Sequence, residues 1–105
     1  MATVLAEQVG DDGRTVRVED DPGARRYSVF VDGERAGYAT YDDAPGVRTV
    51  LHTEIDPRFE HHGLAGALAR AALDDLKTRA VRLVPRCPFF ERFVASHPEF
   101  ADLVT

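Results

Sequence analysis

The sequence has 105 residues and a formal net charge of -5 at pH 7, with 13 Lys and Arg against 18 Asp and Glu. A chain of this length is expected to form a single domain over residues 1–105, burying about 60–70% of the surface that the unfolded chain exposes. The acidic balance argues against a nucleic-acid partner, because proteins that bind nucleic acids normally carry a basic face.

Cysteine content and hydropathy bear on the compartment. Cys87 is the only cysteine in the sequence, so it has no partner for an internal disulfide. No apolar stretch approaches the length of a signal-peptide core or a membrane span. We therefore expect a cytoplasmic protein without a membrane partner, since a reducing compartment suits an unpaired thiol.

The first half of the chain predicts an antiparallel meander. Alternating apolar residues at 16–18 and an apolar run at 27–31 predict two strands, separated by turn-forming residues. Asp32-Gly33 predicts a tight hairpin into a third strand around 36–41, because glycine adopts the positive φ that a primed turn needs. Residues 1–12 predict either an extra edge strand or a loose arm.

The longest predicted strand spans residues 47–56 and follows a turn at 43–46. Strict alternation assigns every second residue of this strand to one face: Arg48, Val50, His52, Glu54 and Asp56. That face is unusually ionisable for a strand in the middle of a sheet.

The second half of the chain changes to a helical period. Apolar residues spaced four apart predict a helix over 64–79, and residues 81–84 predict a short strand after it. A strand, a helix and a strand in this order form a right-handed crossover with the two strands parallel. Pro88 can open a last short helix that ends near His97. The predicted fold class is therefore α+β, an antiparallel meander continued by one β-α-β unit.

The junction between the long strand and the helix carries the strongest functional signal. The first helical turn contains Gly63, Ala65 and Gly66. Backbone N–H groups there lack partners and lie at the positive end of the helix dipole, so small side chains let an anionic group approach. Taken alone, these residues are equally compatible with glycines that serve only close helix packing.

Three stretches of the chain, 52–65, 81–85 and 87–100, together resemble the GNAT acetyltransferase superfamily, in particular its short single-domain YjdJ-type branch. The pyrophosphate loop of that superfamily has Gln or Arg, two variable residues, Gly, a variable residue, and Gly or Ala. This pattern maps onto Glu60-His61-His62-Gly63-Leu64-Ala65. Glu60 departs from the first position, but the backbone donors do not depend on that side chain.

The resemblance implies a GNAT-like mixed sheet whose two parallel strands splay apart to hold acetyl-coenzyme A (acetyl-CoA). The pantetheine arm would follow the strand end at Ile55 and Asp56. The pyrophosphate would be capped by the loop and the first helical turn, residues His61, His62, Gly63, Leu64, Ala65 and Gly66. A solvated side chain is the alternative for His62, and no metal is expected because adjacent histidines point in different directions.

The resemblance also implies acetyl transfer to a primary amine, which must lose a proton before it attacks the thioester carbonyl. Glu54 is the first candidate for the base and His52 the second. The alternative is that they only hydrogen-bond each other or a neighbouring loop. Cys87 would lie near the thioester, where a thiol can protonate the leaving group, accept the acetyl group or form a mixed disulfide with coenzyme A. A buried, inert thiol is its alternative role.

These observations predict a small N-acetyltransferase with acetyl-CoA as cosubstrate and an unidentified amine as acceptor. The alternative function is a sensor or interaction module that binds coenzyme A, keeps the fold and lacks useful turnover. The exposed edges of the predicted meander are compatible with a homodimer but do not require one.

Overall fold

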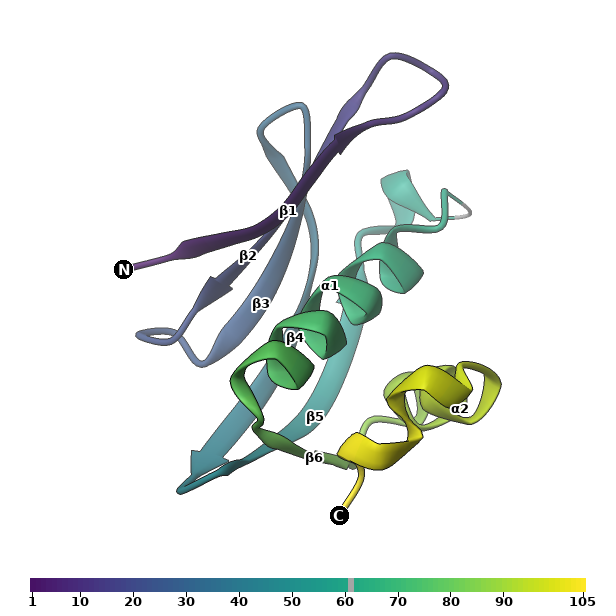
Figure 1. The fold of residues 1–105 in the computed structure, drawn as a ribbon. Coiled ribbons are helices and arrows are strands. Elements are labelled where there is room, and N and C mark those ends of the chain that lie inside the picture. The colour runs from purple at the N-terminus through teal and green to yellow at the C-terminus, as the bar shows by residue number, and fades with distance from the viewer. Residues whose placement is uncertain (61) are drawn as a thin grey trace.

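The computed structural model describes residues 1–60 and 62–105, which form a mixed sheet with two α-helices packed on the same face (Figure 1). The strands lie in the sheet in their sequence order: β1 (Thr3–Val9), β2 (Thr15–Asp21), β3 (Arg26–Val31), β4 (Glu34–Ala44), β5 (Val47–Ile55) and β6 (Arg82–Pro85). Neighbours from β1 to β5 pair antiparallel, whereas β6 pairs parallel with β5. The predicted α+β architecture, a meander followed by a β-α-β unit, is confirmed.

The turns of the meander depend on glycine at defined positions. Asp32 and Gly33 have φ angles of 48° and 85°, which is the left-handed pair that a primed two-residue hairpin needs. The predicted hairpin is therefore confirmed. The edge strand β1 pairs along β2 from Thr3 opposite Asp20 to Val9 opposite Thr15. Of the two expectations for residues 1–12, the extra edge strand is therefore the one confirmed.

The helices bury the stripes that the sequence predicts. Helix α1 (Leu64–Arg79) has the predicted bounds, and its apolar stripe is at most 5% exposed: Leu64, Leu68, Ala72 and Leu76. Helix α2 (Pro88–Ser96) begins at the predicted proline and buries Phe90 and Val94. Two short 3-10 helices complete the chain, η1 (Pro57–Phe59) and η2 (Pro98–Leu103). None of the described helices is long and apolar enough to cross a membrane.

A largely buried ionic network centred on Arg48 joins β2, β3, β4 and β5. The Arg48 side chain is 5% exposed and donates hydrogen bonds to Asp20 at 3.0 Å, to Asp43 at 2.7 Å and 2.9 Å, and to the Tyr27 hydroxyl at 2.9 Å. Tyr41 donates its hydroxyl proton to Asp20, and its ring centroid lies 3.7 Å from Arg48 Cζ. The charge of Arg48 is thus satisfied within the core, as a buried guanidinium requires.

A β-bulge in β5 overturns the strict alternation predicted for this strand. Thr40 of β4 pairs with His52, and the next residue, Tyr41, pairs with Val50. Leu51 is therefore an extra residue on β5, and an extra residue shifts the alternation of the side chains by one.

The bulge divides the ionisable face that alternation predicts. Arg48 and Val50 are buried on the helix face, which we define as the face covered by α1 and α2. His52 and Glu54 are exposed on the opposite, outer face. The prediction that these four residues share one face is therefore wrong.

The pairing of β5 with β6 covers only the first half of β5. Residues 47–50 pair with residues 82–85. The N–H groups of Arg86 and Cys87 then both donate to the carbonyl of Val50 at 3.0 Å. Residues 51–55 continue without a partner from β6, so the two parallel strands separate at the bulge, as the predicted splay requires.

Candidate functional site

A cavity of about 570 Å³, the helix-face cavity, lies where β5 ends and α1 begins. Its wall combines the strand end, the loop, the first turn of α1 and the start of α2: Ile55, Phe59, Glu60, Gly63, Leu64, Ala65, Gly66 and Phe89. The structure thus brings together most of the residues predicted to hold coenzyme A, with apolar side chains on the walls.

The first turn of α1 presents backbone donors at this cavity that have no acceptor within the helix. The N–H of Ala67 donates to the carbonyl of Gly63 at 3.1 Å. The amides of residues 64–66 precede this bond, so they have no acceptor within the helix. They also lie at the positive end of the helix dipole, and this combination suits a phosphate group.

The backbone conformation favours glycine at residue 63, whereas residue 66 has room for a side chain. Gly63 has φ 71° and ψ 16°, a left-handed conformation that favours glycine. At Gly66 a Cβ atom would meet Phe93 Cε2 at 3.9 Å, an ordinary contact, and at Gly63 it would meet nothing within 4 Å. Neither glycine is required by close packing, so the packing alternative is not supported, and both leave the backbone accessible.

Two other residues predicted to bind the coenzyme, Asp56 and His62, do not line this cavity. Asp56 caps η1 by accepting the N–H of Arg58 at 2.9 Å and pairs with its guanidinium at 3.0 Å. These hydrogen bonds hold the pKa of Asp56 below its usual range. His62 lines a neighbouring cavity of about 280 Å³ together with Asp12 from the β1–β2 hairpin. His61 lies outside the described residues.

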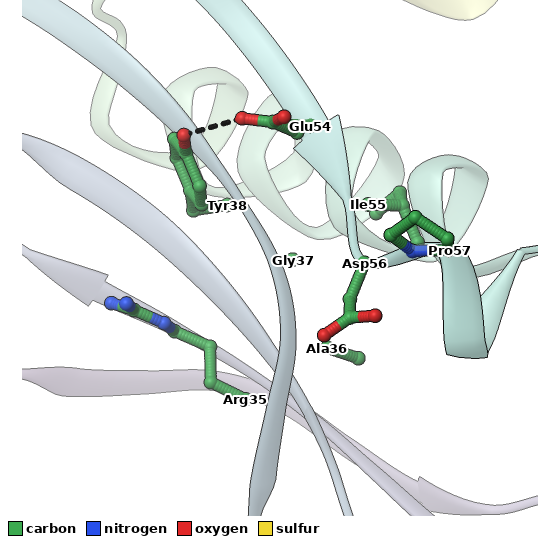
Figure 2. Close-up of a pocket in the computed structure, with 8 residues that line it drawn as sticks. All are labelled: Arg35, Ala36, Gly37, Tyr38, Glu54, Ile55, Asp56 and Pro57. Carbon is green, nitrogen blue, oxygen red and sulfur yellow. Dashed lines mark hydrogen bonds between the residues drawn. The ribbon is translucent and has the colours of Figure 1, made fainter.

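The two candidate bases lie on the outer face. Tyr38 donates its hydroxyl proton to Glu54 Oε2 at 2.6 Å, and His52 Nε2 lies 3.6 Å from the same oxygen (Figure 2 shows the first contact). The Tyr38 hydrogen bond, and then that of His52, lowers the pKa of Glu54 below its usual 4.5, because both favour the carboxylate form. The same hydrogen bond raises the pKa of Tyr38.

A second cavity of about 310 Å³, the outer cavity, lies beside Tyr38 and Glu54. Eight residues line it: Arg35, Ala36, Gly37, Tyr38, Glu54, Ile55, Asp56 and Pro57 (Figure 2). Ile55 lines both the outer and the helix-face cavity, so the end of β5 separates the two. At Gly37 a Cβ atom would lie 2.7 Å from the carbonyl oxygen of Glu54. Only glycine fits this close approach of β4 to β5.

Cys87 lies in the core at the N-cap of α2 and is 3% exposed. Its Sγ atom lies 3.2 Å from Thr53 Oγ1. This contact links the segment that follows β6 to the part of β5 that β6 no longer pairs with. The three reactive roles suggested for the thiol stay predictions. Among residues 1–60 and 62–105, no group of three or more His, Cys, Asp or Glu side chains is arranged to hold a metal ion.

Sequence reasoning missed two residues of the outer cavity, Tyr38 and Arg35. Tyr38 sets the ionisation of Glu54, and the Arg35 guanidinium lies over the Tyr38 ring, with Cζ 5.8 Å from the centroid. Alternation along β4 signals only that Tyr38 faces away from its buried neighbour Ala39. Which residue of β5 lies opposite Tyr38 depends on the bulge, which the alternation does not reveal.

A family model and two relatives match most of this chain. A family model described as GCN5-related N-acetyl-transferase matches residues 26–103. Protein NATD1 of Bos taurus is 30% identical over 90 residues, which cover 84% of this chain and 80% of that protein. Protein NATD1 of Mus musculus is 29% identical over 100 residues, covering 93% and 91%.

Two solved structures share the fold. A ribosomal-protein alanine N-acetyltransferase from Escherichia coli has a TM-score of 0.54 and 24% identity, covering 57% of this chain and 39% of that chain. A ribosomal-protein-alanine N-acetyltransferase from Brucella melitensis has a TM-score of 0.53 and 19% identity, covering 84% and 62%. This chain therefore spans less than two thirds of either enzyme, and at these identities the likeness concerns the fold alone.

Proposed function

Because the chain belongs to the GCN5-related N-acetyltransferase family, we propose that it transfers the acetyl group of acetyl-CoA to a primary amine. The observation that carries this proposal is the first turn of α1, where the amides of residues 64–66, which have no acceptor within the helix, meet the helix-face cavity of about 570 Å³. These amides suit the diphosphate of the coenzyme. The apolar side chains of Phe59, Leu64 and Phe89 on the same wall suit its hydrocarbon portions.

In the proposed reaction the amine nitrogen forms a bond to the acetyl carbonyl carbon and the carbon–sulfur bond breaks. An amine that binds as an ammonium first gives one proton to a base, which frees the lone pair of its nitrogen. The nitrogen loses a second proton as the amide forms, and coenzyme A leaves as a thiol after its sulfur takes up a proton. The acetyl thioester supplies the activated carbonyl. The chain supplies the position of both reactants and an acceptor for the proton.

Glu54 is the proposed proton acceptor. Its carboxylate is ionised at neutral pH, as a carboxyl group with the usual pKa of 4.5 already is, and Tyr38 and His52 lower this pKa further. A carboxylate also attracts the ammonium form of an amine and places it beside the strand end that separates the two cavities. His52, 3.6 Å away, is the second candidate.

A coenzyme A-binding module without useful turnover is the second candidate function. The observation that favours it is the exposure of both candidate bases, whose side chains are 60% (His52) and 59% (Glu54) exposed. Catalytic groups usually work in a site that excludes water. Turnover assays with a panel of amines separate the two functions, because only the first produces an acetylated amine and free thiol.

Substitution of Gly66 tests the proposed coenzyme site. Gly66→Asp places a carboxylate beside the amides of the first helical turn, and a Cβ fits there without a close contact. An acid in the first helical turn favours the helix, so the fold should persist. We expect calorimetric titration to show acetyl-CoA and coenzyme A bound at least about tenfold more weakly by the variant, equivalent to about 1.4 kcal/mol.

Gly66→Ala is the matched control, because it adds the Cβ without the charge and should bind like the wild type. Equal affinity in Gly66→Asp would move the diphosphate away from this turn. A wild-type protein that binds neither acetyl-CoA nor coenzyme A would overturn both candidate functions.

A further inference from the structure

The outer cavity places two opposite charges around one aromatic ring (Figure 2). Glu54 lies at the hydroxyl end of Tyr38 and accepts its proton at 2.6 Å. Arg35 lies over the face of the same ring, with Cζ 5.8 Å from the centroid. Both charged side chains are exposed to solvent and both line the cavity.

The charged groups of the cavity differ in how well the protein itself satisfies them. Asp56 is paired with Arg58, which also donates to Glu34 at 2.8 Å. In contrast, no ion pair links Arg35 to a carboxylate in the part of the chain that the structure describes. Over the same residues, only the Oε2 oxygen of Glu54 accepts a hydrogen bond. Arg35 and the second oxygen of Glu54 are thus available to a ligand.

We propose that the outer cavity binds an acceptor that carries both an amino group and a carboxylate, as a free amino acid does. The ammonium group would lie at Glu54 and the carboxylate at Arg35, whose planar guanidinium matches a carboxylate with two parallel hydrogen bonds. The inference rests on the proposed function, since the amine held at Glu54 is the group that receives the acetyl.

The shape of the cavity fits such a ligand. Gly37 lets β4 approach β5 closely beside Arg35 and Glu54, because a Cβ atom there would be 2.7 Å from the Glu54 carbonyl oxygen. The Tyr38 ring and Pro57 provide apolar surface for the hydrocarbon of the ligand. A ligand with two positive charges would instead bring a second cation toward Arg35, which is repulsive.

Binding measurements with matched probes test the proposal. The probes are glycine, β-alanine, 4-aminobutyrate and 6-aminohexanoate, each compared with the amine of equal carbon count that lacks the carboxylate. Titrations followed by the backbone amide NMR signals of Gly37 and Tyr38 give affinities without turnover. We expect at least one amino acid to bind about tenfold more tightly than its amine, as one charge-assisted contact provides.

Arg35→Gln should abolish this preference by weakening the binding of the amino acid, because the variant removes the partner of its carboxylate. The matched control is Arg92→Gln, an exposed arginine on α2 that does not line the cavity, and it should keep the preference. Equal binding of the amino acids and their amines, or a preference that survives Arg35→Gln, would overturn the inference.

The two proposals fail separately. If acetyl transfer to simple amines occurs and the carboxylate preference is absent, the proposed function stands and the acceptor class is wrong. If the preference is present but the protein binds neither acetyl-CoA nor coenzyme A, the transferase proposal fails and the outer cavity is a binding site for amino acids.

Discussion

Tyr38 lowers the pKa of Glu54 more strongly than any other side chain does. Its hydroxyl donates to the carboxylate at 2.6 Å, and His52 contributes next at 3.6 Å. A carboxylate stabilised in this way is a weaker base in solution, so its use in proton transfer depends on its position beside the amine. At the scale of single residues, the site therefore depends on a tyrosine that carries no charge itself.

Tyr38→Phe removes this donor and should raise the pKa of Glu54 toward its usual 4.5. Carbon NMR titration of the Glu54 carboxyl group measures the change directly. His52→Ala should shift the pKa in the same direction by less, because the tyrosine hydrogen bond is the larger cause. An unchanged pKa in Tyr38→Phe would show that this hydrogen bond is not formed in solution.

Glu54→Gln keeps the shape of the side chain and removes its ability to accept a proton. We expect kcat to fall by about 10²–10⁴-fold, the usual contribution of a general base. Binding of acetyl-CoA should be unaffected, because Glu54 does not line the helix-face cavity. Steady-state kinetics and calorimetry measure the two effects, with Glu91→Gln on the exposed surface of α2 as control. An unchanged kcat would remove Glu54 from the role of base.

The sequence led to Glu54 and His52 but not to their partner. Counting back from the turn pair Ala44 and Val47 places Tyr38 opposite Thr53, whereas the observed partner is Glu54. The difference is the single extra residue at Leu51. A leucine has no property that marks a bulge, so the pattern of residue types cannot reveal it.

At the scale of elements, strongly periodic segments were predictable and weakly patterned ones were not. Helix α1 has the predicted bounds, because its apolar stripe and its glycine start coincide in the sequence. Strand β1 could not be decided from sequence, since most of its side chains are exposed and carry no burial pattern. Its place depends on pairing with β2, a tertiary effect that local pattern does not encode.

The Arg48 network should dominate the stability of the β2–β4–β5 region. Arg48→Met fills a similar volume but leaves Asp20 buried without its cation. Breaking a buried pair in this way costs about 3–5 kcal/mol, a large share of the stability of a small domain. Urea denaturation measures the loss.

The double variant Arg48→Met with Asp20→Asn is the control, because it removes the orphaned charge and should recover part of the stability. A loss below about 1 kcal/mol in the single variant would mean that water reaches Asp20 and replaces the arginine.

At the scale of the whole molecule, the two cavities lie on opposite sides of one strand end. Both α-helices pack on the helix face (Figure 1). The amides of α1 meet the first cavity on this face, and the residues of the outer cavity (Figure 2) lie on the other side of the strand end. The end of β5, freed from β6 by the bulge, is the element common to both. A cosubstrate and an acceptor can therefore approach the same strand end from different faces.

The stability of the whole molecule should fall at alkaline pH because of Tyr27. This side chain is fully buried, and burial raises its pKa from 10.0 to about 12, although the neighbouring Arg48 acts in the opposite direction. A pKa that is higher in the folded state means that the native protein holds its proton when the unfolded chain has lost it. The contribution of Tyr27 to the free energy of unfolding is therefore complete below pH 10 and is lost as the pH rises to about 12.

The free energy of unfolding should thus decrease by up to about 3 kcal/mol across this range, since each pKa unit corresponds to about 1.4 kcal/mol. Urea midpoints measured between pH 9 and pH 12 test it. Tyr27→Phe is the reference, because it removes this proton while every other titrating group remains. The free energy of unfolding of this variant should therefore decrease less over the same pH range than that of the wild type. Equal slopes for the two proteins would show that the phenol ionises as easily in the folded core as in the unfolded chain.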